Sequence, residues 1–317
     1  MSDKKGSTKG KGIGGQAIIE GVMMRGHSVY SMAVRHPEKG ILIETKPIAK
    51  NGKKAKILKL PLIRGVVNFF DSLVVGMKVT MRSAEMSGME ELEYDKSSKF
   101  EMWLEKKFGD KLSQYIVYFS VIISIILSVG LFFILPTLIG GWISKGFNDS
   151  TSIRSVAESV VKIIIFLGYM LLISLMKDVK RTFMYHGAEH KTINAYESDI
   201  ELTVENVKNS TRFHKRCGTS FLVIVMIISI VVFLFIPTNS GLIRVLSRVI
   251  LVPVIAGLSY EVIKWAGSHD NWFVNMISAP GIAMQFITTK EPDDSMIEVA
   301  IASLKAVIDE EASEDDN

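Results

Sequence analysis

The stretch QYIVYFSVIISIILSVGLFFILPTLIGGWIS, residues 114–144, decides the fold class of this chain. It carries no charged side chain, and it is longer than the roughly 20 residues with which a helix crosses the hydrocarbon core of a bilayer. A soluble domain rarely contains an uncharged apolar run of this length. The stretch therefore predicts a membrane-spanning helix and an integral membrane protein.

Three further segments are apolar enough to span a bilayer. Residues 155–176 carry Glu158 and Lys162 close to one end, and residues 217–243 carry no charge. Residues 242–267 form a weaker candidate, with ionisable residues near both ends and a proline inside, which suggests a kink. We therefore expect about four transmembrane helices.

The composition agrees with a membrane protein that also has water-exposed parts. Hydrophobic residues make up 48% of the 317 residues, with a mean hydropathy of +0.28, yet 22% are charged. The formal net charge of +4 is too small to indicate a nucleic-acid partner, so none is expected. The single cysteine, Cys217, excludes an internal disulfide.

The distribution of lysine and arginine predicts the orientation of the spans. The clusters KKFGDK, KDVKR and RFHKR precede the first span, follow the second and precede the third, which places them all on one side. The connecting loops on the other side hold fewer basic residues. Since basic loops stay in the cytoplasm, both termini are expected to be cytoplasmic.

The expected fold is a mainly α-helical polytopic membrane protein with a small N-terminal cytosolic β-unit and interfacial amphipathic helices. The PEKG sequence predicts a hairpin turn within the β-unit. The expected segments are a flexible basic tail (1–12), the β-unit (13–57), interfacial and cytosolic helices (58–113), the four-span domain (114–267) with a cytosolic metal-site loop (178–216), an interfacial segment with a C-terminal helix (268–306) and an acidic disordered tail (307–317).

The motif YHGAEHKTINAYE, residues 185–197, carries the most specific chemistry in the chain. His186 and His190 are one helical turn apart, so both imidazoles can reach one divalent metal. With Glu189 they form His-x-x-Glu-His, the arrangement of the inverzincin metallopeptidases. There the glutamate activates a metal-bound water, which makes Glu189 the candidate catalytic base.

Several residues compete for the third ligand position. His214 and Cys217 in FHKRCGTS would complete a closed structural zinc site. Glu261, an ionisable residue within the fourth predicted span, would instead leave one position open for water, as in catalytic zinc sites. Glu197, two helical turns beyond His190, is a weaker option.

The remaining polar residues of the N-terminal region carry weaker signals. Glu20 and Arg25 would face opposite sides of an unbroken strand. Glu20 becomes a candidate near the metal if Gly21 bulges this strand and brings the two side chains together. The GIGG sequence lacks the lysine or serine of a phosphate-binding loop and is expected only to give flexibility. His27 and His36 lack the spacing of metal ligands.

A family resemblance covers residues 13–306. It rests on GGQAIIEGVMMRG, YHGAEHKTINAYE, LTVENV, HKRCGTSF, GLSYE and TTKEPDDSMIEVAIASL, which together resemble the bacterial YqhQ family. The members of this family are integral membrane proteins of unknown function that carry the label of predicted metal-dependent enzymes. The resemblance implies a metal at residues such as His186, Glu189 and His190, and it implies no particular reaction.

The leading hypothesis is a zinc-dependent hydrolase in the bacterial inner membrane, acting at the cytosolic face on a membrane-embedded peptide or lipid-like substrate. The alternative is a non-catalytic partner of a protein-insertion or translocation complex, with a structural metal. A small-ion transporter is the weakest hypothesis, because the spans hold few polar groups. The lipid bilayer is an expected partner in each case.

Overall fold

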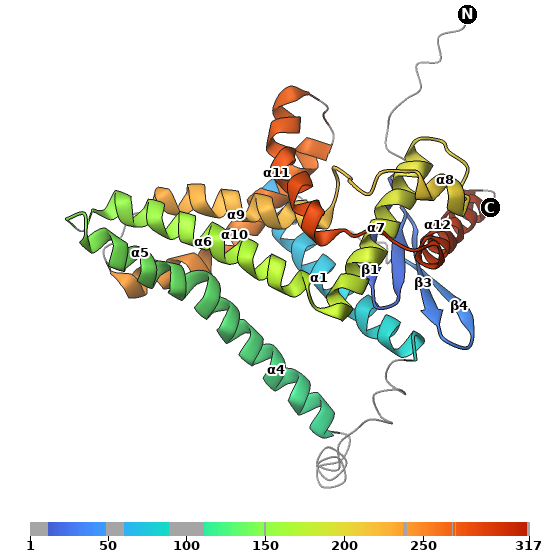
Figure 1. Ribbon diagram of the computed structural model, residues 1–317, viewed down its shortest axis with the longest axis horizontal. Helices are drawn as coiled ribbons and strands as arrows, with labels where there is room; N and C mark the ends of the chain where they lie inside the picture. Colours follow the sequence, from blue (N-terminus) through green and yellow to red (C-terminus); the bar gives the residue numbers. More distant parts are fainter. Residues whose placement is uncertain are drawn as a thin grey trace, which may run out of the picture.

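A computed structural model describes residues 12–48, 60–88, 111–148, 150–236, 240–267, 269 and 271–315. The predictions for residues 1–11, 49–59 and 89–110 fall outside the described residues. A β-sheet with its covering helices forms one end of the molecule, and a bundle of apolar helices extends from it (Figure 1). The chain is mostly helical with a small N-terminal antiparallel sheet, which confirms the coarse fold prediction.

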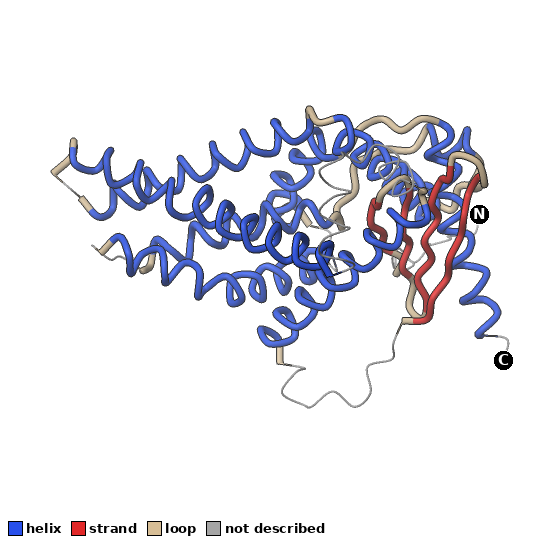
Figure 2. The backbone as a smooth tube through the Cα atoms, turned by 90° about the horizontal axis from the view of Figure 1, so that it is seen from below, coloured by secondary structure: helices blue, strands red, loops and turns tan. Residues whose placement is uncertain are grey.

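The sheet is a four-stranded antiparallel meander in the order β1-β2-β3-β4 (Figure 2). Its strands are β1 (Gly14–Ile18), β2 (Gly21–Arg25), β3 (Val29–His36) and β4 (Gly40–Pro47). The predicted PEKG hairpin joins β3 to β4, where His36 pairs with Gly40. The meander has β1 at one edge, next to helix α7 (Lys177–Glu197).

Helices cover both faces of the sheet, which explains why β2 and β3 are buried almost throughout. On one face, Val22 and Met24 join a core with α12 (Asp294–Asp315). On the other face, Met23 and Met32 pack with Val79 of α1 (Pro61–Met86). The first and last parts of the described chain therefore form one folded unit.

The acidic segment 307–317 differs from the prediction of a disordered tail. Helix α12 continues to Asp315, because Val307 is fully buried and Ile308 packs against the same core. The segment 178–216, predicted as a loop, is also largely helical. It contains most of α7 (Lys177–Glu197) and the short helix α8 (Val204–Lys208).

The bundle contains α4 (Lys111–Val129), the π-helical turn η2 (Gly130–Ile134), α5 (Leu135–Lys145), α6 (Thr151–Ser174), α9 (Gly218–Leu234), α10 (Gly241–Gly267) and α11 (Trp272–Thr288). Three helical stretches are long and apolar enough to cross a bilayer: 119–145, 151–174 and 241–266. The predicted span 217–243 is the exception. It becomes the shorter α9 of 17 residues, which ends at Leu234 with Phe235 as its C-cap, and residues 241–243 belong to α10.

Candidate metal centre

Helix α7 carries the histidine motif into the interior, between the sheet and the bundle. Although α7 is polar in sequence, its second half is buried against β1, β2 and α12. Tyr185, Ala188 and Ala195 are fully buried. These apolar contacts hold the polar residues between them, Glu189 and His190, in a site that is shielded from water.

His186, His190 and Cys217 form a group whose ligand atoms all lie within 4.8 Å of one another. The two imidazole rings have their centroids 4.4 Å apart, as expected for residues one turn apart on the same side of a helix. His186 Nε2 lies 3.2 Å from Cys217 Sγ. Such a spacing is suitable for one divalent metal between the three side chains.

Backbone carbonyls orient both imidazoles. His186 Nδ1 lies 2.8 Å from the carbonyl oxygen of Thr288, and His190 Nδ1 lies 2.7 Å from that of Arg212. A carbonyl oxygen only accepts, so each Nδ1 carries the proton and each Nε2 keeps its lone pair. This second hydrogen bond is the one that metal-ligating histidines make almost always. Burial also lowers the pKa of His190, against the effect of Cys217, and favours its neutral form.

Cys217 occupies the N-cap position of α9, where its Sγ accepts a hydrogen bond from the backbone N–H of Thr219 at 3.3 Å. The side chain is only 5% exposed. Cys217 therefore holds a sulfur ligand atom in a fixed position at the start of α9, beside the two imidazoles.

Glu189 lies beside this group with one oxygen unsatisfied. Its side chain is buried, and among the described residues Oε2 has no hydrogen-bond partner. Burial raises the pKa of Glu189, while His186, His214 and the backbone N–H of Ala17 oppose the rise. A buried unpaired carboxylate oxygen is costly, so this atom is suited to a group that the protein itself does not supply.

His214 is engaged elsewhere. Its Nε2 lies 3.4 Å from Glu197 Oε2, and Glu197 also pairs with Arg216. Although burial has the opposite effect, these contacts lower the pKa of Glu197. The His214 ring lies near the group, with its centroid 5.7 Å from that of His190, but the structure does not bring its nitrogen or Glu197 into the set of three.

Glu261 and Glu20 are also held by arginines. Arg64 of α1 forms a bidentate pair with Glu261, with distances of 3.1 Å and 2.6 Å. Glu20 has a φ of 51° and pairs with Arg181, and Tyr185 lies 3.4 Å from its carboxylate. Of the candidates for the third ligand, the structure therefore brings Cys217 alone to His186 and His190 within the described residues.

A cavity of about 470 Å³ lies beside the centre. It is lined by the glycine-rich start of the sheet, including Gly14 and Gly15, and by Gly218, which follows Cys217. A Cβ atom built on Gly15 would lie 2.7 Å from Glu189 Cγ, so only glycine leaves room for the carboxylate there. The cavity is lined by Gly15 and Gly218, which neighbour the centre, and Glu189 and the three ligands are not part of its lining.

Sequence reasoning missed the contribution of β1. The GIGG sequence suggested only flexibility, whereas Gly15 and Ala17 contact Glu189 in the structure. The carbonyl groups of Thr288 and Arg212 were missed as well. No side-chain pattern in a sequence shows which backbone carbonyl will accept a hydrogen bond from a histidine. The one available signal was the glycine-rich run that contains Gly15.

The comparisons with known proteins show the family of this chain. The model of the family described as a protein of unknown function (DUF1385) matches residues 60–310. The uncharacterised protein YqhQ of Bacillus subtilis (strain 168) is 35% identical over 306 residues, which cover 96% of this chain and 94% of that protein. No solved structure matches. The chain therefore belongs to the DUF1385 family, as the resemblance to YqhQ predicted.

Proposed function

We propose that this protein is a metal-dependent membrane enzyme, a zinc hydrolase whose centre is held by His186, His190 and Cys217. Two imidazole nitrogens and one cysteine sulfur match the ligand preferences of zinc. A bound divalent cation acts as a Lewis acid and lowers the pKa of water. The carbonyl groups that fix both imidazoles support this assignment, because they aim the Nε2 lone pairs toward Cys217.

The number of ligands supports a catalytic centre. Structural zinc sites use four protein ligands, whereas catalytic sites use three and keep one position open. The group has three members among the described residues. His214, the residue that would close the site, is paired with Glu197. A substrate oxygen would therefore find a free coordination position.

The unpaired Oε2 of Glu189 is the observation that carries the proposal. The residue is adjacent to His190, its carboxylate is buried, and it interacts with His186. In this position Glu189 takes a proton from the attacking water and returns it to the leaving group. The surrounding apolar residues exclude bulk water, which strengthens the electrostatic interactions within the site.

We further propose that the centre lies at the cytosolic face of an inner membrane, with both termini cytoplasmic. Helix α12 packs against β2, where Met24 N donates to Ser303 Oγ at 3.2 Å, so both ends of the described chain lie on one side. That arrangement requires an even number of crossings. The three long apolar helices and the shorter α9 make four, and modest local thinning of the bilayer would accommodate α9.

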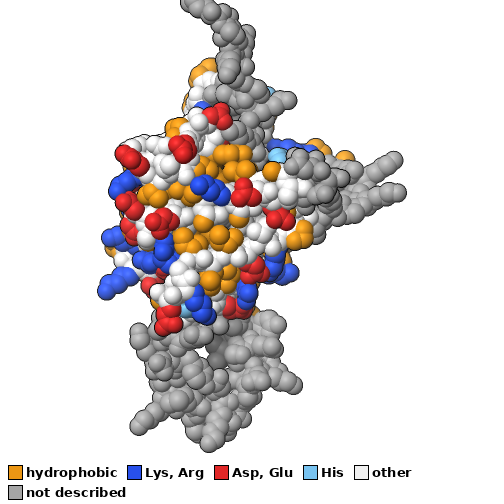
Figure 3. Space-filling view, turned by 90° about the vertical axis from the view of Figure 1, so that its right-hand side faces the viewer, with side chains coloured by type: hydrophobic (Ala, Val, Ile, Leu, Met, Phe, Trp, Pro, Cys, Tyr) orange, Lys and Arg blue, Asp and Glu red, His pale blue; other side chains and the backbone are white. Residues whose placement is uncertain are grey.

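The surface supports the same placement. The end of the molecule formed by β4 and α12 presents interspersed acidic and basic side chains (Figure 3), as a water-exposed surface does. The bundle instead exposes large apolar side chains, such as Leu127, Ile164 and Leu172. The centre lies between these two regions, at the level where α6 passes into α7. A membrane-embedded peptide or lipid-like substrate is the class that a centre at this boundary would meet.

The test begins with the metal content of the purified full chain. The wild type should hold zinc or a similar ion at near-stoichiometric occupancy, and His186→Ala should lose it. His27→Ala is the matched control, because His27 is exposed and remote from the group, and it should keep the metal. A wild type that holds no metal after mild isolation, and rebinds none, would refute the proposal.

Glu189→Gln then separates catalysis from structure. It keeps the shape of the side chain but removes the base, so it should retain metal and abundance while losing complementation of a deletion strain. Loss of a positioned base lowers a rate by about 10² to 10⁴-fold. If Glu189→Gln complements like the wild type, the centre is structural, and a non-catalytic partner of a membrane complex becomes the better reading.

A further inference from the structure

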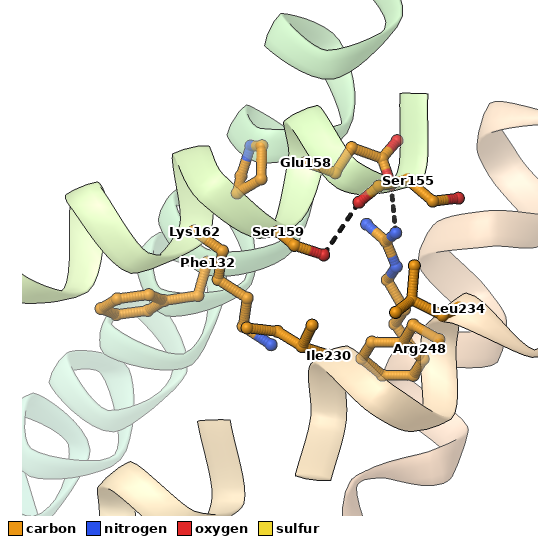
Figure 4. Close-up of a pocket in the computed structure, with 10 residues that line it drawn as sticks. Phe132, Ser155, Glu158, Ser159, Lys162, Ile230, Leu234 and Arg248 are labelled. Atoms are coloured by element: carbon orange, nitrogen blue, oxygen red, sulfur yellow. Dashed lines mark hydrogen bonds and ion pairs between the residues drawn. The ribbon is translucent and has the colours of Figure 1, made fainter. Parts of the chain in front are cut away.

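A second polar cluster lies inside the bundle, at the end remote from the sheet. Glu158 of α6 is 2% exposed and pairs with Arg248 of α10 (Figure 4). Arg244 of the same helix pairs with this carboxylate at 3.1 Å. Arg154 Nε lies 3.3 Å from the same carboxylate. Arg248 also donates to Thr137 Oγ1 at 2.8 Å. This cation cluster is separate from the candidate metal centre.

The charges of the cation cluster do not balance. Arg154, Lys162, Arg244 and Arg248 provide four positive charges against the single carboxylate of Glu158, which leaves +3. Asp149 lies outside the described residues, and counting its charge in full would still leave +2. Arg244 and Arg248 are buried, whereas Arg154 and Lys162 are partly exposed. An excess of positive charge within apolar helices is costly. An anion from outside the chain would reduce that cost.

Lys162 is the member with unused donors. It lies at the middle of α6, and among the described residues its ammonium donates to Ser229 Oγ alone, at 2.7 Å. Its Nζ also lies 5.6 Å and 5.4 Å from the ring centroids of Phe133 and Phe233. An ammonium has three donors, so Lys162 retains the capacity for an additional anionic acceptor.

An apolar cavity of about 360 Å³ begins at Lys162. Lys162 also lines the small polar pocket of the cation cluster (Figure 4), as do Phe132 and Phe233, and these shared residues show that the two spaces adjoin. Away from Lys162, the cavity follows one side of α9 from Phe233 back to Phe221. That stretch of helix is about 18 Å long at 1.5 Å per residue. The cavity has the size of ordinary ligand sites.

We propose that this cavity binds an anionic phospholipid. The phosphate of the head group would accept hydrogen bonds from Lys162. It would also neutralise part of the positive charge around Arg248 that Glu158 does not compensate. One acyl chain would lie along α9, among aromatic and aliphatic side chains. The apolar cavity favours a lipid over free phosphate, since phosphate alone would leave it empty. This site is independent of the proposed metal chemistry.

The test measures lipid binding to the purified full chain by native mass spectrometry, with phosphatidylglycerol, phosphatidylcholine and inorganic phosphate as probes. Phosphatidylglycerol should bind more tightly than phosphatidylcholine. Lys162→Met should weaken its binding about tenfold to a hundredfold, the effect of losing a charge-assisted hydrogen bond. Lys145→Met, at the exposed last turn of α5, is the matched control and should bind like the wild type.

A cavity-filling variant distinguishes the lipid from a free anion. Val225→Phe leaves the cation cluster intact but occupies the cavity, so it should weaken phosphatidylglycerol binding, and it decides the matter alone if Lys162→Met does not fold. Equal binding of the two lipids, or wild-type binding by Lys162→Met, would overturn the proposal. Tight binding of inorganic phosphate would also overturn the proposal if Val225→Phe changes neither phosphate binding nor lipid binding. Lys162→Met should keep its metal, so failure here leaves the metal proposal standing.

Discussion

Replacing Gly15 by alanine would test the position of Glu189 without touching the metal ligands. A Cβ atom at Gly15 would lie 2.7 Å from Glu189 Cγ, 2.8 Å from Oε1 and 2.9 Å from Cδ. At Gly14, by contrast, a Cβ atom would meet nothing within 4 Å. Both glycines lie in β1 with ordinary φ values, so the backbone effects of Gly14→Ala and Gly15→Ala should match.

The size of the effect follows from the overlap. Carbon atoms pack at about 3.5 Å or more, so Glu189 Cγ has to retreat by roughly 0.8 Å to admit the new methyl group. Overpacking of this kind costs about 1–3 kcal/mol of stability. A displacement near 1 Å of a reacting group lowers a rate by about 10²-fold. Gly15→Ala should therefore impair function strongly while His186, His190 and Cys217 still bind metal.

The assay compares Gly14→Ala and Gly15→Ala for metal content, thermal unfolding in detergent and complementation at graded expression levels. Gly14→Ala should match the wild type in all three. Gly15→Ala should keep its metal and should need much higher expression to complement. If Gly15→Ala complements at the expression level of Gly14→Ala, the carboxylate of Glu189 has no positional role, and the reasoning that links β1 to the centre is wrong.

Three further outcomes are expected. Cys217→Ser should weaken zinc binding by about 10²–10³-fold in a chelator competition. The binding free energy of a structural zinc site with four protein ligands is about 10–16 kcal/mol, which is roughly 2.5–4 kcal/mol for each ligand. Unchanged affinity would remove Cys217 from the site. Gly65→Ala should lower the unfolding temperature, because its Cβ would lie 2.6 Å from the carbonyl oxygen of Gly257, whereas Gly168→Ala, with open space, should not. Asp293→Ala should cost about 1 kcal/mol at pH 7, since Asp293 Oδ1 accepts a backbone N–H at the start of α12. Although burial has the opposite effect, hydrogen bonds lower the pKa of Asp293. The stabilisation by Asp293 is therefore complete above its ordinary pKa of 3.8 and disappears as the pH falls through the lowered pKa. A loss of stability in Asp293→Ala that persists in acid would contradict this.

Local sequence patterns were sufficient for two of the candidate spans and for the hairpin. Uncharged apolar length is a property of a single segment, so residues 114–144 and 155–176 could be recognised as candidate spans without knowledge of their neighbours. The PEKG turn between β3 and β4 is equally local. The one-turn spacing of His186 and His190 placed both rings on one side of α7 before any tertiary contact was considered.

The third ligand depended on packing between distant segments. His214, Cys217 and Glu261 were all compatible with the sequence, because spacing along the chain does not determine which side chains meet. In the structure Glu261 pairs with Arg64, and His214 pairs with Glu197. Cys217, at the start of α9, is the candidate that lies beside His186 of α7. The end of α12 likewise depended on packing, since Val307 and Ile308 contact the core under the sheet.

The sequence by itself determined the coarse architecture and the start of the candidate centre: apolar helices, a small sheet and a pair of histidines with a glutamate. Only the tertiary structure decided which residues complete the centre and where the cation cluster lies. The physical reason is that helix periodicity and hydrophobic length act within one segment. The choice of Cys217, the unpaired oxygen of Glu189 and the space kept by Gly15 arise from contacts between α7, α9 and β1, which local patterns do not encode.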